Sequence, residues 1–165
     1  MLKDGEIRVL LVDDEQTLLE FLARRLERQG FTVHVAFSGE EALGEVTENP
    51  YDVAVVNTNL SGMNGIRTQN MLREIQPDLQ CIVITQMDCV SDALPWETQQ
   101  CSFCRFLYKP VDFQSLASTI QELYKERQKE KKQNLQAEQG SFQSPPSGLR
   151  GFLRKLKGLY GIPGQ

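Results

Sequence analysis

Five residues whose side chains could bind a metal ion or take part in a reaction each follow or close a short apolar run along the chain. They are Asp13, Asp14, Asn57, Thr85 and Lys109. Three carboxylates gathered at such positions would bind a hard cation such as Mg²⁺ and present one oxygen to a phosphoryl donor. In this chain the third position holds an amide, whose nitrogen is not a nucleophile and whose side chain brings no negative charge to a metal ion. The pattern predicts the surroundings of a phosphoryl acceptor with Asn57 in the place of the acceptor.

The elements that must position these residues alternate from Ile7 to about Lys129 between short apolar runs and amphipathic segments. The runs Tyr51 to Val56 and Cys81 to Ile84 are continuously apolar, which is typical of parallel strands covered by helices on both faces. Five such strand and helix units predict a doubly wound α/β sandwich, with any site at the carboxyl ends of the strands. A C-terminal tail follows this domain.

A family resemblance rests on the motifs at the expected strand ends. They are Asp13-Asp14, Gly62-Met63-Asn64-Gly65, Thr85 and Lys109-Pro110. Singly, an acidic pair is usually a helix cap, a threonine a strand end and a lysine a solvated charge. Their joint placement resembles the receiver domain of two-component response regulators, over about residues 5 to 128. The resemblance implies a five-stranded parallel sheet in the flavodoxin-like order 2-1-3-4-5.

The resemblance also implies a role for each metal-site position. Asp14 falls on the metal-ligand position, Asp13 on its acidic partner, and Asn59 on the position whose backbone carbonyl reaches the ion. Asn57 falls on the phosphoacceptor position, where an asparagine makes the site degenerate. Any Mg²⁺ binding is therefore expected to be weak or vestigial, and no cofactor is required.

Three further positions match the phosphate site and its switch. Thr85 matches the hydroxyl that moves to meet the acyl phosphate, Lys109 the lysine that pairs with it, and Phe106 the aromatic switch position. The peptide before Pro110 matches one that is often cis. Every part that the resemblance implies is present except the acceptor.

Some residues depart from the family pattern. Ser61 stands where the family usually has proline, and Ser102-Phe103 stand where a Gly-Ala pair usually precedes the fifth strand. Asn57 itself has two explanations that the sequence leaves open: a natural loss of phosphorylation, or an acceptor aspartate that was deliberately mutated.

Length and composition describe a soluble globular chain of one domain plus an extension. The chain has 165 residues, 40% apolar and 24% charged. Its apolar stretches are far shorter than the roughly 20 residues that span a bilayer, and acidic Asp4 and Glu6 stand where a signal peptide would be basic. We therefore expect a cytoplasmic protein.

The C-terminal extension is basic where the domain is acidic. Residues 1–124 carry a net charge of −10 and residues 125–165 a net charge of +6. Residues 129–148 are expected to form a flexible linker, and residues 149–165 a basic amphipathic tail. The segment 149–160 could fold on an anionic membrane, in the groove of a partner or on its own acidic receiver; a disordered tail with chance periodicity is the alternative.

Cysteine spacing raises a further possibility. Cys101 and Cys104 have the spacing of a redox or zinc pair, and Cys81 begins a neighbouring strand. The sequence leaves open whether the three thiols cluster; most such cysteines are small core residues.

The sequence thus predicts a two-component-type receiver module that regulates signalling through protein contacts and independently of phosphorylation, and that is not an enzyme. The expected partner is a histidine kinase or a downstream regulator. One alternative is an ordinary phosphorylatable response regulator whose acceptor was changed to Asn57. Others are a nucleic-acid or membrane protein acting through its tail, or a thiol protein. Nucleic-acid binding is disfavoured because the basic tail has no interleaved aromatic platform.

Overall fold

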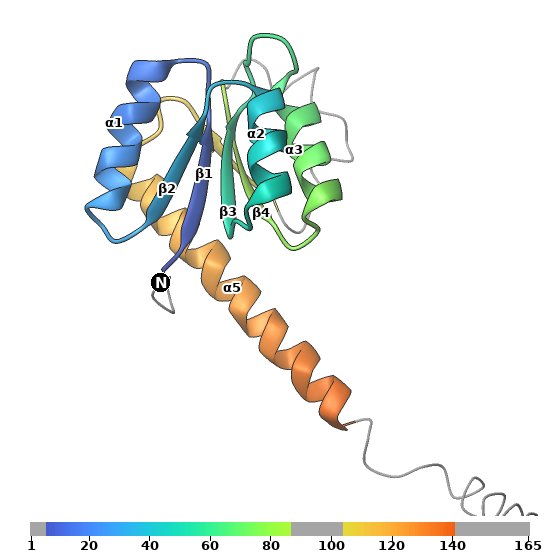
Figure 1. Ribbon diagram of the computed structural model, residues 1–165. Coiled ribbons are helices and arrows are strands. Elements are labelled where there is room, and N and C mark those ends of the chain that lie inside the picture. Colours follow the sequence, from blue (N-terminus) through green and yellow to red (C-terminus); the bar gives the residue numbers. More distant parts are fainter. Residues whose placement is uncertain (1–5, 87–103, 141–165) are drawn as a thin grey trace, which may run out of the picture. The chain divides into compact units, whose positions relative to one another are not determined.

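The computed structural model describes residues 6–86 and 104–140, with side chains to residue 137. The described residues contain a five-stranded parallel sheet in the order β2-β1-β3-β4-β5 (Figure 1). The strands are β1 (Arg8–Val12), β2 (Thr32–Ala36), β3 (Val53–Asn57), β4 (Gln80–Thr85) and β5 (Cys104–Tyr108). The predicted fold class and strand order are confirmed.

Burial along the strands follows their place in the sheet. Every residue of β3 and β4 is buried, whereas the edge strands β2 and β5 are mostly half-buried or exposed. A strand covered on both faces needs apolar side chains at every position, which explains the continuous apolar runs of β3 and β4.

Helices cover both faces of the sheet. The helices α1 (Gln16–Glu27) and α5 (Phe113–Gly140) contribute to one apolar core, while α2 (Gly39–Glu48) and α3 (Gly65–Ile75) contribute to the other. Figure 1 shows α2 and α3 side by side on the face opposite α1. Since each strand sends alternate side chains to opposite faces, the two cores share the same strands.

Side-chain hydrogen bonds cap the first turns of two helices, α2 and α5. The Ser38 hydroxyl accepts a hydrogen bond from the Glu41 amide at 3.1 Å, and the Asp112 carboxylate accepts one from the Ser115 amide at 3.0 Å. Both satisfy amide groups that have no partner inside the first helical turn. Among the described helices, none is long and apolar enough to cross a membrane.

The C-terminal helix is longer than the sequence analysis expected. The chain divides into two compact units, residues 1–127 and 128–165, and α5 continues past this division to Gly140. The expected linker over 129–148 is therefore wrong for residues 129–140. These residues are mainly Lys, Glu, Gln and other strong helix formers, with no glycine or proline before Gly140. Residues 141–148 and the tail 149–165 lie outside the described residues.

Two of the three thiols considered above lie next to each other. Cys81 of β4 and Cys104 of β5 are register partners, and both are buried. The side-chain amide of Gln69 lies 3.1 Å from the Cys104 sulfur. Cys101 lies outside the described residues. Among the residues described, no group of three metal-ligating side chains is gathered in one place.

A polar cluster surrounds the single histidine at the half-buried edge of the sheet. The Tyr51 hydroxyl donates to the Glu45 carboxylate at 2.8 Å and lies 2.7 Å from His34 Nδ1. Burial, followed by the hydrogen bond to Glu45, raises the pKa of Tyr51 well above its usual range. These contacts give His34 a structural role at the edge of the sheet.

One arginine joins α5 to the amino-terminal edge of the sheet. The buried Arg127 guanidinium lies 3.1 Å from an Asp52 carboxylate oxygen and 3.3 Å from one of Asp78. Asp52 also accepts a hydrogen bond from the Arg8 backbone amide at 2.9 Å. The ion pair thus connects the helix to the starts of β1 and β3.

We predict that Arg127→Met lowers the free energy of unfolding by about 2 kcal/mol, because Asp52 keeps a partly buried charge without its ion-pair partner. Lys125→Met, an equal charge change at an exposed position of the same helix, is the matched control. Urea unfolding of both variants measures the effect. Equal stability of the two variants would contradict this role of Arg127.

Candidate phosphoryl-acceptor site

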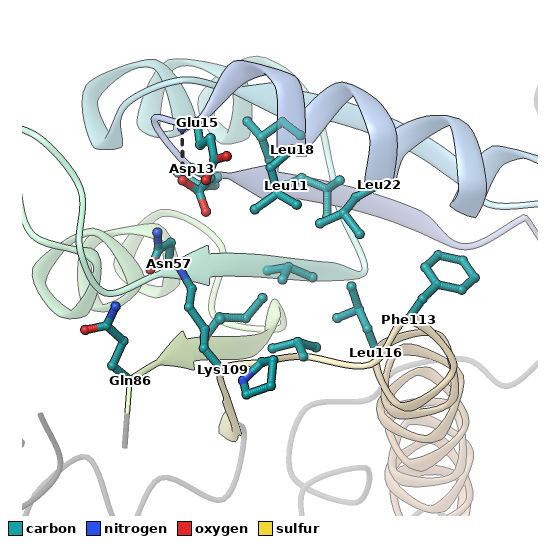
Figure 2. Close-up of a pocket in the computed structure, with 16 residues that line it drawn as sticks. Leu11, Asp13, Glu15, Leu18, Leu22, Asn57, Gln86, Lys109, Phe113 and Leu116 are labelled. Atoms are coloured by element: carbon teal, nitrogen blue, oxygen red, sulfur yellow. Dashed lines mark hydrogen bonds between the residues drawn. The ribbon is translucent and has the colours of Figure 1, made fainter. Parts of the chain in front are cut away.

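The carboxyl ends of four strands meet at one edge of the sheet. Val12 pairs with Val56, Asn57 with Ile84, and Thr85 with Tyr108. A cavity of about 680 Å³ opens beside these ends (Figure 2). Asp13, Asn57 and Lys109 line it. The parallel register therefore brings the central residues predicted from the sequence into one place.

The acidic pair divides between two environments. Asp13 is 6% exposed and accepts a hydrogen bond from the Glu15 amide at 3.0 Å, which shapes the turn into α1. Asp14 is exposed and accepts hydrogen bonds from both the hydroxyl and the backbone amide of Ser61. These hydrogen bonds hold the pKa of Asp14 below its usual value, and the bond from the Ser61 hydroxyl has the largest effect.

Asn57 ends β3 and is 5% exposed. Its side-chain oxygen accepts a hydrogen bond from the Asn59 amide at 3.2 Å, so the oxygen supports the turn after the strand. Gly65 begins α3 directly against the Asn57 carbonyl, where a side-chain Cβ would collide with the backbone. The same turn contains Gly62 at φ +85°, a backbone conformation that glycine adopts without strain.

Thr85 ends β4, the strand beside β3, and Lys109 follows β5, the strand on the other side of β4. The Thr85 hydroxyl is 3.2 Å from that of Thr58, and its carbonyl accepts the Lys109 amide at 2.9 Å. The Lys109-Pro110 peptide is cis, as the family resemblance implies. In Figure 2 the Lys109 side chain extends toward Asn57. Within the described part of the chain, Lys109 forms no ion pair.

Phe106 lies apart from this cavity. Its half-buried ring packs against the core beneath α2 and α3, whereas the cavity opens on the face covered by α1 and α5. Asp13, Asn57 and Lys109 therefore line one cavity. Hydrogen bonds connect Asp14, Asn59 and Thr85 to residues of the turn after β3. Phe106 lies on the other face of the sheet.

The donor set is a poor match for a tight Mg²⁺ site. Mg²⁺ prefers near-octahedral oxygen ligands, usually with one or two carboxylates and water. Of the two carboxylates, Asp14 already accepts two hydrogen bonds from Ser61, and the Asn57 oxygen accepts one from Asn59. Receiver domains as a class bind Mg²⁺ weakly at this site; the arrangement here offers less negative charge than three carboxylates would.

Sequence reasoning missed three residues of this edge. Ser61 was noted only as a departure from the family pattern, yet it anchors Asp14. Glu15 and Gln86 line the cavity. Glu15 directly follows the acidic pair and Gln86 directly follows Thr85, so adjacency to the predicted strand ends was the signal that could have identified them.

We predict that Ser61→Ala raises the pKa of Asp14 toward that of an ordinary aspartate, because the strongest hydrogen bond to the carboxylate is lost. The native bond stabilises the fold above the ordinary aspartate pKa, and this contribution disappears as the pH falls through the lowered value. Carbon-13 NMR titration of the carboxyl groups measures the shift. Asp112, whose pKa is lowered by Ser115, is the internal control. An unchanged Asp14 pKa would refute the assignment.

The comparisons with known proteins agree with this geometry. The transcriptional regulatory protein GlrR of Escherichia coli is 34% identical over 112 residues, 68% of this chain and 25% of that protein. The chain thus matches about a quarter of the length of such curated relatives. A response regulator receiver domain from Clostridium thermocellum superimposes with a TM-score of 0.67 at 27% identity, over 74% of this chain and 97% of that one.

A further solved structure, the response regulator TrrA of Thermotoga maritima in complex with Mg²⁺ and BeF, has a TM-score of 0.61 at 25% identity, over 71% of this chain and 98% of that one. The family model of the response regulator receiver domain matches residues 9–121. This chain belongs to the response regulator receiver domain family.

Proposed function

We propose that this receiver regulates signalling through protein contacts without phosphorylation of an aspartate. The observation that carries the proposal is Asn57 at the carboxyl end of β3, buried and with its side-chain oxygen engaged by the Asn59 amide. An amide at this position provides no oxygen nucleophile for a phosphoryl group. The chain itself is proposed to be a binding module and not an enzyme.

The proposed partner is a protein. Receiver domains interact with histidine kinases and downstream effectors, and GlrR and ZraR are named transcriptional regulatory proteins. We propose the same classes of protein partner for this chain. The chain matches only about a quarter of the length of these relatives, so a direct role of this chain in binding nucleic acid is not proposed. For the segment 149–160, an anionic membrane or a partner groove remains the proposed surface.

A specific observation also supports the second candidate, an ordinary phosphorylated receiver whose aspartate was replaced by Asn57. Asp14, Thr85 and Lys109 all lie at the same sheet edge, so the environment around the acceptor position is retained. Both candidate functions attribute the loss of phosphorylation to the residue at position 57. They differ in whether the natural protein carries aspartate at position 57, which sequencing of the natural gene decides.

We predict that Asn57→Asp restores acceptance of phosphate from phosphoramidate or acetyl phosphate in the presence of Mg²⁺. The substitution supplies the nucleophile and a third carboxylate, while Thr85 and Lys109 are already in place. Intact-mass spectrometry is expected to show one phosphoryl adduct on the variant and none on the parent chain.

Asn57→Asp/Lys109→Met is the matched control, since it has the acceptor but lacks the ammonium group at the phosphate. We expect it to form the adduct more slowly than Asn57→Asp. An adduct on the parent would overturn phosphorylation independence. No adduct on Asn57→Asp would show that the pocket has lost more than its acceptor, so that the second candidate is wrong and the first stands.

A separate prediction concerns the metal ion. Asn57→Asp is expected to bind Mg²⁺ at least about fivefold more tightly than the parent, because one formal charge close to a divalent ion is worth about 1 kcal/mol or more even in a solvated site. Asn70→Asp, which places the same charge at an exposed position of α3, is the control. NMR titration of the amides near Asp13 gives both dissociation constants. Equal affinities of parent and Asn57→Asp would contradict the electrostatic account.

A further inference from the structure

The cavity beside Asn57 continues as an apolar groove along α1. Its half-buried walls are Leu18 and Leu22 of α1 and Val111 of the loop after β5. Its floor is formed by core residues such as Leu11 and Leu116, at most 1% exposed. We call this space the α1 groove. Figure 2 shows Leu18 and Leu22 facing the space between α1 and the sheet.

The polar end of the α1 groove is acidic on balance. Asp13 and Glu15 contribute carboxylates beside β1, and Lys109 contributes one ammonium group from the end of β5. Asp13 is 6% exposed, so its side chain is largely shielded from bulk water. The groove therefore has an excess of one negative charge at one end and apolar walls along the rest.

We infer that the α1 groove binds a small amphiphilic amine, with its ammonium group beside Asp13 and Glu15 and its alkyl body along Leu18 and Leu22. The volume of about 680 Å³ lies in the range of small-molecule sites, which combine apolar walls with a few polar groups that orient the ligand. A positive head complements two carboxylates against one ammonium, whereas an anionic head would meet a net negative charge. This inference does not depend on whether position 57 can be phosphorylated.

The spacing of Leu18 and Leu22 along α1 sets the length of the ligand's alkyl chain. Leu18 and Leu22 are four residues apart on one helix and so lie about 6 Å apart along its axis. An alkyl chain of about six carbons is about as long as that spacing. Hexylamine is accordingly the probe, and it is protonated at neutral pH because an alkyl ammonium group titrates near the pKa of lysine.

The test uses the full chain with methyl-labelled leucines. We expect hexylamine to shift the Leu18 and Leu22 methyl signals in a saturable manner, and to bind at least about fivefold more tightly than hexanoate, since the two heads differ in the sign of their charge. Methylamine, which has the head without the alkyl chain, is expected not to shift these methyl signals. Hexylamine without a saturable effect overturns the site. Hexanoate binding as tightly as hexylamine overturns the ligand class.

Matched variants locate the two halves of the site. Leu22→Trp fills the groove and is expected to weaken hexylamine binding at least about tenfold, while Phe21→Trp, on the same helix but 55% exposed and outside the groove, leaves it unchanged. Leu18→Phe is the second filling variant should Leu22→Trp not fold. Glu15→Gln is expected to lower the affinity for hexylamine several-fold, and Glu20→Gln, the same charge change outside the groove, is not. Unchanged binding in a folded filling variant overturns the proposal.

Discussion

Parallel register at the carboxyl edge of the sheet is the constraint on which the site depends. Because β1, β3, β4 and β5 run in the same direction and are paired residue by residue, their last residues lie at one edge. Asp13, Asn57, Thr85 and Lys109 follow or end those strands. Residues far apart in the sequence thereby meet without any loop having to reach across the fold.

The turn after β3 adds a second constraint. Gly65 lies too close to the Asn57 carbonyl to carry a side chain, and the Asn57 side chain accepts the Asn59 amide. Asn57 therefore has a structural task in holding the turn after β3. Ser61 extends this arrangement to Asp14, whose hydrogen bonds to the loop occupy an oxygen that would otherwise be open to a cation. The hydrogen bonds between Asp14 and Ser61 thus connect the loop after β1 to the loop after β3.

Much of the fold followed from local sequence patterns, and the site followed from strand ends. Continuous apolar runs predicted β3 and β4, because a strand covered on both faces needs apolar side chains at successive positions. The strand order came from the family resemblance, since hydrophobic pattern alone does not determine which strands pair. The convergence of Asp13, Asn57 and Lys109 could be predicted once parallel strands were assumed.

Other features depend on distances that the sequence does not contain. The contact between Arg127 and Asp52 joins residues 75 positions apart, and no local pattern distinguishes Arg127 from the other basic residues of α5. The helical course of residues 129–140 was missed because polar composition was interpreted as a linker, although the same residue types are strong helix formers. The α1 groove needed the packing of α1 against the sheet, which periodicity does not give.

The central claim is that this receiver retains the frame of a phosphoryl-acceptor site without the acceptor. Beryllofluoride tests it directly, because this phosphoryl mimic needs a carboxylate oxygen to complete its tetrahedron. Fluorine-19 NMR of the parent chain with Mg²⁺, beryllium and fluoride is predicted to show no protein-bound fluoride signal, while Asn57→Asp gives one. A bound signal on the parent chain that disappears on Asn57→Ala would contradict the account.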